Sequence, residues 1–217
     1  MSADRSRHSP VRATVTALML GLVGTGMAGA TIVSGTVTSA TGSFVKLSVP
    51  LTGSTPANTV GNNNFNQPNL YGFDESQNTT LTAALVPDQG AALAAGTTVA
   101  SHYIFFDPTS GALTGTVTFD ANVLAVLSST ATLLATDYLA NTGVTYLNPT
   151  LRGLEAVDSV GFSGNQITVN LTASSPGDYI RVLTAFSPGA VPEPGSLALA
   201  GLALTGLIAA SRRRRRG

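Results

Sequence analysis

The sequence predicts an all-β fold, an antiparallel β-sandwich of the jelly-roll or immunoglobulin-like kind, over residues 31–190. Charged residues make up only 10% of the 217 residues, which leaves little Lys and Glu for the solvated faces of long helices. Gly, Ser, Thr and Asn are abundant, which is typical of short strands joined by turns. Several short segments also alternate between apolar and polar residues with a period of two, which is the pattern of half-buried strands.

Period-two alternation is clearest at 43–49 and at 166–172, and each segment is predicted to be a strand. A hairpin is predicted from 97–106 and 113–119, because the residues between them, from Asp107-Pro108 to Gly111, favour a tight turn. The last strand is expected at 178–186, directly after a Ser-Pro-Gly turn. Weaker strand patterns occur at 70–73, 80–85 and 158–162.

Three segments differ from this strand pattern. Residues 128–141 carry leucines and a tyrosine at helical spacing, which predicts a short helix crossing between the sheets. Residues 149–157 are expected to form a helical turn before the next strand. Residues 54–69 contain three consecutive asparagines and no apolar period, so this segment is predicted to be a long surface loop.

The N-terminal residues 1–30 have the three parts of a secretory signal peptide. A positively charged region precedes the uncharged stretch 13–27, and Ala28 and Ala30 then satisfy the small-x-small rule for cleavage. We expect export by the general secretory machinery and cleavage by signal peptidase after Ala30. An uncleaved N-terminal anchor is the alternative interpretation of the same stretch. The positive charges are Arg5, Arg7 and Arg12.

The C-terminal residues 191–217 combine a proline motif, an apolar run and a basic tail. The two prolines prevent a helix from extending upstream, so a transmembrane helix is predicted over 195–210, roughly 24 Å long. The basic tail is expected to stay in the cytoplasm and to place the preceding domain outside the inner membrane. The motif is Val191, Pro192, Glu193, Pro194 and Gly195, and the tail is Arg212, Arg213, Arg214, Arg215 and Arg216.

These C-terminal residues resemble the PEP-CTERM sorting signal, whose three parts occur here in the same order. The resemblance implies that Pro192, Glu193 and Pro194 are recognised by a membrane protease of the exosortase type. It also implies a protein held transiently in the inner membrane and then delivered to the cell surface or beyond. Proteins of this family occur in Gram-negative bacteria that make exopolysaccharide, so exopolysaccharide is an implied partner. An ordinary tail anchor with a proline-rich hinge is the alternative.

The charge of the central region argues against one class of partner. Between residues 31 and 190 there are three basic and nine acidic residues, a net charge of about −6. A surface of this sign repels phosphates, so we expect no nucleic acid partner. The chain has no cysteine, and an exported domain without disulfides has to rely on its apolar core.

No catalytic residue and no cofactor are predicted, and the chain is interpreted as not being an enzyme. His102 is the single histidine of residues 31–190 and is expected on the solvent face of a strand, since one imidazole without cysteine makes a poor zinc site. Residues 161–165 resemble a nucleophile elbow only faintly and fit a β-turn better. No Gly-rich phosphate loop with its lysine occurs.

The carboxylates leave several hypotheses open. Asp107 and Asp178 are expected at strand ends, where loop carboxylates of exported sandwiches commonly bind calcium, and they are the candidate metal ligands. The simpler interpretation is that they form turns and add surface charge. Three functions remain: a noncatalytic surface or matrix protein, a module that binds polysaccharide or calcium, and a secreted hydrolase. A cluster of buried carboxylates would favour the second or third.

Overall fold

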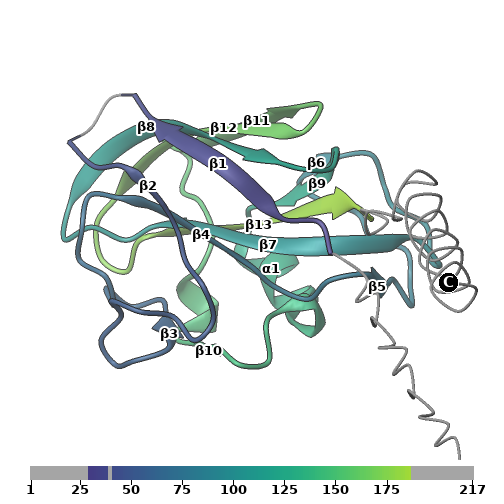
Figure 1. The fold of residues 1–217 in the computed structure, drawn as a ribbon, viewed down its shortest axis with the longest axis horizontal. Helices are drawn as coiled ribbons and strands as arrows, with labels where there is room; N and C mark the ends of the chain where they lie inside the picture. The colour runs from purple at the N-terminus through teal and green to yellow at the C-terminus, as the bar shows by residue number, and fades with distance from the viewer. Residues whose placement is uncertain (1–28, 39–40, 187–217) are drawn as a thin grey trace, which may run out of the picture.

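The computed structural model describes residues 29–38 and 41–186, and two β-sheets packed face to face form its main part (Figure 1). A third layer of loops and short helices covers the outer face of the larger sheet. The prediction of a mostly β fold with packed antiparallel sheets is therefore confirmed. Residues 1–28 of the predicted signal peptide and the whole segment 191–217 lie outside the described residues.

The smaller sheet has four antiparallel strands in the order β1-β8-β12-β11. Its strand β12 alternates strictly between exposed and buried positions, so one face of this sheet meets solvent and the other meets the core. Ile167, Val169 and Leu171 are the inward residues of that strand. The bounds are β1 Ile32–Val37, β8 Gly111–Phe119, β11 Ser159–Ser163 and β12 Gln166–Ala173.

The larger sheet has the order β2-β4-β7-β13-β9-β6, and β5 also pairs with β7. Its pairs are antiparallel except β2 with β4, which run parallel. The central strands β7 and β13 are buried along almost their whole length, because both faces of the sheet are covered. The bounds are β2 Phe44–Lys46, β4 Leu70–Asp74, β5 Thr79–Thr80, β6 Gln89–Gly90, β7 Thr98–Phe106, β9 Val123–Leu127 and β13 Asp178–Ala185.

Two apolar cores lie on the two faces of the larger sheet. Strand β7 contributes Ile104 and Phe106 to the core between the sheets, and Tyr103 and Phe105 to the core beneath the third layer. This division follows from the alternation of side chains along a strand. The second core is rich in aromatic rings, and the ring centroids of Phe65 and Tyr71 lie 5.0 and 5.1 Å from that of Phe105.

The third layer contains the helices α1 Thr130–Ala135, η1 Asp137–Leu139 and η2 Pro149–Leu151. The short parallel pair of β3 Thr59–Val60 and β10 Thr145–Tyr146 lies beside them. The helical segments predicted within 128–141 and 149–157 are confirmed, although the helices are shorter than those ranges. Within the residues that the structure describes, no helix is long and apolar enough to cross a membrane, and the predicted membrane helix 195–210 lies outside them.

Several predicted strands are shorter because the chain leaves the sheet to fill the second core. The strand expected at 43–49 ends at Lys46, and Leu47 is buried beneath the third layer. The strand expected at 80–85 ends at Thr80, because Leu81 turns into the same core. The segment 54–69 is not purely a surface loop, since Phe65 is buried within it.

Asparagines explain the path of that segment. Four of its residues have a left-handed backbone, at φ between 50° and 62°, a conformation that asparagine tolerates better than most residues. This curled backbone lets the segment fold over the second core without regular secondary structure. The four residues are Asn58, Asn62, Asn63 and Asn66.

Candidate functional site

Three carboxylates from separate parts of the chain meet at one end of the sandwich. The side chains of Glu155, Asp158 and Asp178 each offer an oxygen, and these oxygens lie within 4.8 Å of one another. Asp178 is the first residue of β13, whereas Glu155 and Asp158 lie in the segment between η2 and β11. The carboxylate of Asp178 is buried, with only 1% of the residue exposed, and neither of its oxygens has a hydrogen-bond partner.

Backbone amides fix the position of Asp158 in this cluster. One carboxylate oxygen accepts a hydrogen bond from the backbone nitrogen of Glu155 at 3.0 Å. The other accepts one from the backbone nitrogen of Thr172 in β12 at 2.7 Å. Asp158 therefore attaches its loop to the smaller sheet. Glu155 is exposed, so the cluster reaches solvent on that side.

No basic side chain of the described residues is paired with this cluster. The three available cations bind elsewhere, since Lys46 pairs with Asp74, Arg152 with Asp137, and Arg181 with Glu75 and Asp137. Burial, together with the neighbouring Glu155 and Asp158, raises the pKa of Asp178 to about 8. Three carboxylates without nitrogen or sulfur ligands suit a hard cation such as calcium.

The other predicted metal ligand, Asp107, does not join the cluster. Asp107 follows β7 and accepts a hydrogen bond from the backbone nitrogen of Phe65 at 3.1 Å, which anchors the Asn-rich segment over the second core. Phe106, which pairs with Asp178, points into the core between the sheets. Burial raises the pKa of Asp107. The structure therefore separates Asp107 from Asp178 and assigns the two residues different surroundings.

Sequence reasoning missed Glu155 and Asp158. Both lie in the segment expected to be a helical turn, which the structure shows to be helical only as far as Leu151. The three-residue spacing of these acids was the available signal, but sequence alone gave no reason to bring them beside the start of the last strand. Their position depends on the contact of Asp158 with β12.

His102 was expected on a solvent face, and this prediction is wrong. Its side chain is fully buried between the sheets, where its ring lies 4.8 Å from that of Phe119. Nδ1 lies 2.7 Å from an oxygen of Asp74, and Nε2 lies 3.0 Å from the hydroxyl oxygen of Thr184. Hydroxyl, imidazole and carboxylate follow the order of a catalytic triad, but Thr184 is 0% exposed, so a substrate has no access to it.

Asp74 also holds the first strand in place. It accepts hydrogen bonds from the hydroxyl of Thr31 at 2.7 Å and from the backbone nitrogen of Ile32 at 3.0 Å. Burial favours the neutral carboxyl of Asp74, but the hydrogen bonds from His102 and Thr31 outweigh it and hold its pKa well below the usual value. Asp74 and His102 therefore form a structural link between β1, β4 and β7.

A second ionic group joins the larger sheet to the third layer. Arg181 donates two hydrogen bonds to Glu75, at 2.6 and 3.0 Å, and both side chains are fully buried. Glu75 also accepts hydrogen bonds from the hydroxyls of Ser101 and Tyr146. Arg181 further donates to the backbone oxygen of Leu133 in α1. These contacts fasten α1 and β10 to the central strands.

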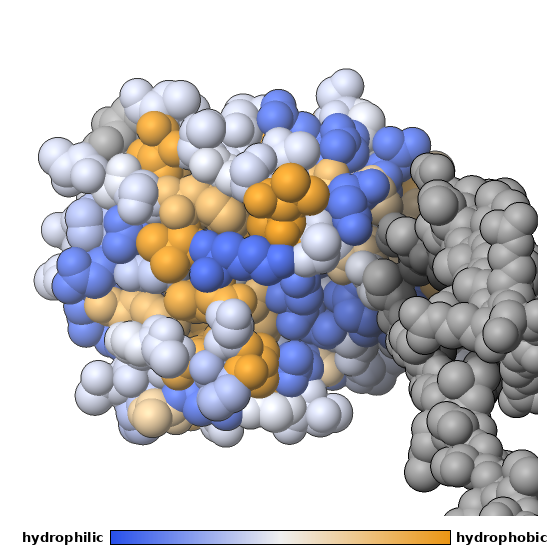
Figure 2. Space-filling model, viewed as in Figure 1, coloured by the Kyte–Doolittle hydropathy of each residue, from blue (hydrophilic) through white to orange (hydrophobic). Residues whose placement is uncertain are grey.

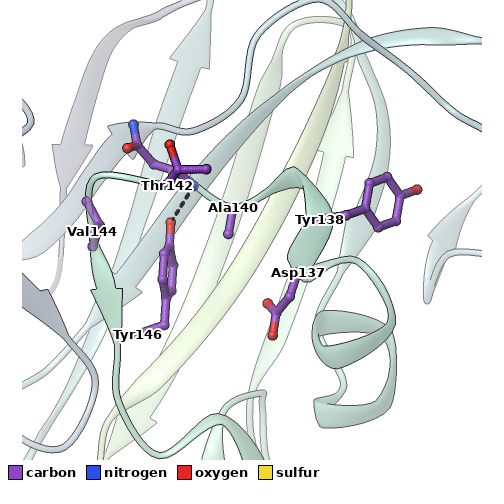
Figure 3. A pocket seen from close by; sticks show the side chains of 7 residues that line it. Asp137, Tyr138, Ala140, Thr142, Val144 and Tyr146 are labelled. Carbon is purple, nitrogen blue, oxygen red and sulfur yellow. Dashed lines mark hydrogen bonds between the residues drawn. The ribbon is translucent and has the colours of Figure 1, made fainter.

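A pocket of about 390 Å³ lies between η1 and β10 (Figure 3). Asp137 is the carboxylate that lines it, and Arg152 holds this group through two hydrogen bonds, at 3.0 and 2.7 Å. The hydroxyl of Tyr146 accepts a hydrogen bond from the backbone nitrogen of Asn141. The ring of Tyr138 points away from the other lining side chains. The pocket is lined by Asp137, Tyr138, Ala140, Asn141, Thr142, Val144 and Tyr146.

One face of the molecule is mixed in character. On the face shown in Figure 2, hydrophobic residues form separate patches that are divided by hydrophilic ones. This face therefore presents no single broad apolar area.

The predicted cleavage point lies at the start of the described chain. Ala28, residues 191–195 of the sorting motif and the basic tail 212–216 lie outside the described residues, whereas Ala30 lies within them. The backbone nitrogen of Thr31 donates a hydrogen bond to Asp120 at 2.7 Å.

We expect the mature protein to begin at Thr31, because Ala28 and Ala30 satisfy the small-residue rule for cleavage. Cleavage there leaves an α-amino group that stays beside the carboxylate of Asp120. Mass spectrometry of the N-terminal peptide from surface-localised protein checks this. An intact N-terminus, or one that begins beyond Thr31, would contradict it.

The comparisons with known proteins identify only the C-terminal end of the chain. Residues 190–216 match the family model of the PEP-CTERM protein-sorting motif. No curated protein and no solved structure matches the chain. The chain therefore carries a PEP-CTERM protein-sorting motif at its C-terminus, which makes it an exported, membrane-sorted protein that is processed by an exosortase.

Proposed function

We propose that residues 31–190 form a noncatalytic module that is displayed at the cell surface or incorporated into the exopolysaccharide matrix. The observation that carries this proposal is the C-terminal sorting motif, since exosortase processing delivers a protein out of the membrane. The sandwich is then the cargo of this route, and exopolysaccharide is its partner.

The use of the ionisable groups supports a noncatalytic role. His102, Glu75 and Arg181 are all buried. His102 contacts Asp74, and Arg181 donates to Glu75. These groups therefore connect strands and layers and are not accessible to a substrate. Burial of this kind stabilises one arrangement of the chain and keeps these three groups away from the surface of a cleft.

The pocket gives little support to the alternative of a secreted hydrolase. A glycosidase needs two carboxyl groups about 5–10 Å apart that flank the scissile bond. Among the residues that line the pocket there is a single carboxylate, Asp137, and Arg152 and Arg181 already bind it. The aromatic ring of Tyr138 also points out of the pocket, so it is poorly placed to stack on a bound sugar.

The proposal is tested by following the full chain in a bacterium that has an exosortase and makes exopolysaccharide. Immunoblots of membrane, washed matrix and medium should place the protein mainly in the matrix. A matched strain without exopolysaccharide should release it into the medium, and a variant without residues 190–216 should not reach the matrix. Equal matrix retention without exopolysaccharide, or depolymerisation of the extracted polysaccharide by the purified protein, would contradict the proposal.

A further inference from the structure

We propose that Glu155, Asp158 and Asp178 bind one calcium ion, which clamps the two sheets together at the end of the sandwich where β13 begins. This site is independent of the sorting route, since it depends only on the geometry of the folded domain.

Asp178 is the observation that separates this cluster from an ordinary group of surface acids. Only 1% of the residue is exposed, and both of its buried carboxylate oxygens lack a hydrogen-bond donor. A buried charge without a partner is strongly unfavourable, so such groups in folded proteins are paired or bind metals. The carboxylate lies beside Glu155 and Asp158, which offer further oxygens and no proton donor. A cation at this point would supply the missing partner.

The spacing of the oxygens fits one calcium ion. Calcium binds oxygen ligands at about 2.3–2.6 Å, so two ligands of the same ion lie at most about 5 Å apart. The three carboxylate oxygens lie within 4.8 Å of one another. Carboxylates bind calcium through one or both oxygens, and water can complete the coordination on the side of the exposed Glu155. Magnesium demands a tighter octahedron, and zinc favours nitrogen or sulfur ligands.

The ligands come from elements that belong to different sheets. Asp158 is attached to β12 of the smaller sheet through the backbone nitrogen of Thr172. Asp178 begins β13, a central strand of the larger sheet. An ion bound to both would join the sheets at this end and would order the segment between η2 and β11. Without the ion, the neighbouring carboxylates of Glu155 and Asp158 disfavour a negative charge on Asp178.

Thermal unfolding of the full chain in mild detergent tests the site. We compare about 10 mM calcium with chelator, and with sodium chloride at matched ionic strength. This concentration is roughly a hundredfold above a Kd of ~10⁻⁴ M for extracellular calcium modules. Calcium should raise Tm by about 5–10 °C, sodium should not, and calorimetric titration should give one ion per chain.

Variants assign the effect to these residues. Asp178→Asn should abolish the gain from calcium, and in chelator it should melt no lower than the wild type because the amide is of similar size and carries no charge to bury. Glu155→Gln changes an exposed residue, and it should remove most of the gain. Asp120→Asn, an exposed carboxylate outside the cluster, serves as the matched control and should keep the gain.

Two results would overturn the proposal. Identical melting of the wild type in calcium and in chelator would mean that Asp178 is satisfied by a proton shared with Glu155. A calcium gain that persists in both Asp178→Asn and Glu155→Gln would place the bound ion elsewhere on the chain.

Discussion

Replacing Arg181 with Met should lower the free energy of unfolding by about 3–5 kcal/mol, because it leaves Glu75 as an unpaired buried charge. Both side chains are fully buried, and the pair has two hydrogen bonds, at 2.6 and 3.0 Å. The change also removes the guanidinium that donates to the backbone oxygen of Leu133 and to the hydroxyl oxygen of Thr136. These two hydrogen bonds hold the third layer on the larger sheet. Thermal unfolding should show Tm lowered by about 6–20 °C.

A double variant and a surface control make this result specific. Adding Glu75→Gln to Arg181→Met should restore part of the loss, since a neutral amide can still accept the hydroxyl of Tyr146. Lys46→Met breaks a partly exposed pair with Asp74 and should cost about 1 kcal/mol or less. If Arg181→Met costs no more than Lys46→Met, the buried pair does not hold the layers together.

Replacing Arg212, Arg213, Arg214, Arg215 and Arg216 with glutamine should abolish most exosortase processing. A basic residue near an anionic cytoplasmic leaflet contributes about 1 kcal/mol, so the five together contribute about 5 kcal/mol to the correct orientation. The predicted helix over 195–210 is short for a bilayer, and it has little hydrophobic energy with which to compensate. Immunoblots of membrane and matrix fractions should show the unprocessed chain accumulating.

The control for this experiment keeps the charge and changes the residue type. Five lysines at the same positions satisfy the positive-inside rule as well as arginines do, so this variant should be processed normally if orientation is the requirement. Normal processing of the glutamine variant would show that the basic tail is dispensable. Failure of the lysine variant would instead indicate that the protease recognises arginine itself.

The strands predicted best from the sequence are those whose own residues show which face is buried and which is exposed. The strand at 166–172 has one face in water and one in the core, and the alternation of its side chains reports this directly. Both strands on either side of the turn from Asp107 to Gly111 are present as β7 and β8, but the prediction that they form a hairpin is wrong, because β7 lies in the larger sheet and β8 in the smaller one. The sorting motif was recognisable for a similar reason, since its three parts are contiguous in the chain.

The rest depended on contacts between distant segments. Strand β1 was not predicted, because only its first residue is fully buried and its small and polar residues hide the alternation with a period of two. His102 could not be placed, since its burial depends on Asp74 and on Thr184, which lies 82 residues away. The same holds for the acidic cluster, where Asp178 was a candidate but its neighbours were not. Local periodicity carries no information on such pairings.

The attachment of the first strand has a consequence for the timing of export. Thr31 reaches its partner Asp120 only after 89 further residues have been made, which takes roughly 4–18 s at a synthesis rate of about 5–20 residues per second. A peptidase needs an accessible, extended backbone, whereas Ala30 is 1% exposed in the folded domain. If the leader is removed after Ala30, as predicted, the cut therefore belongs to the interval before β1 pairs with β8. Once β1 has paired with β8, the peptide bond after Ala30 is no longer accessible to the peptidase.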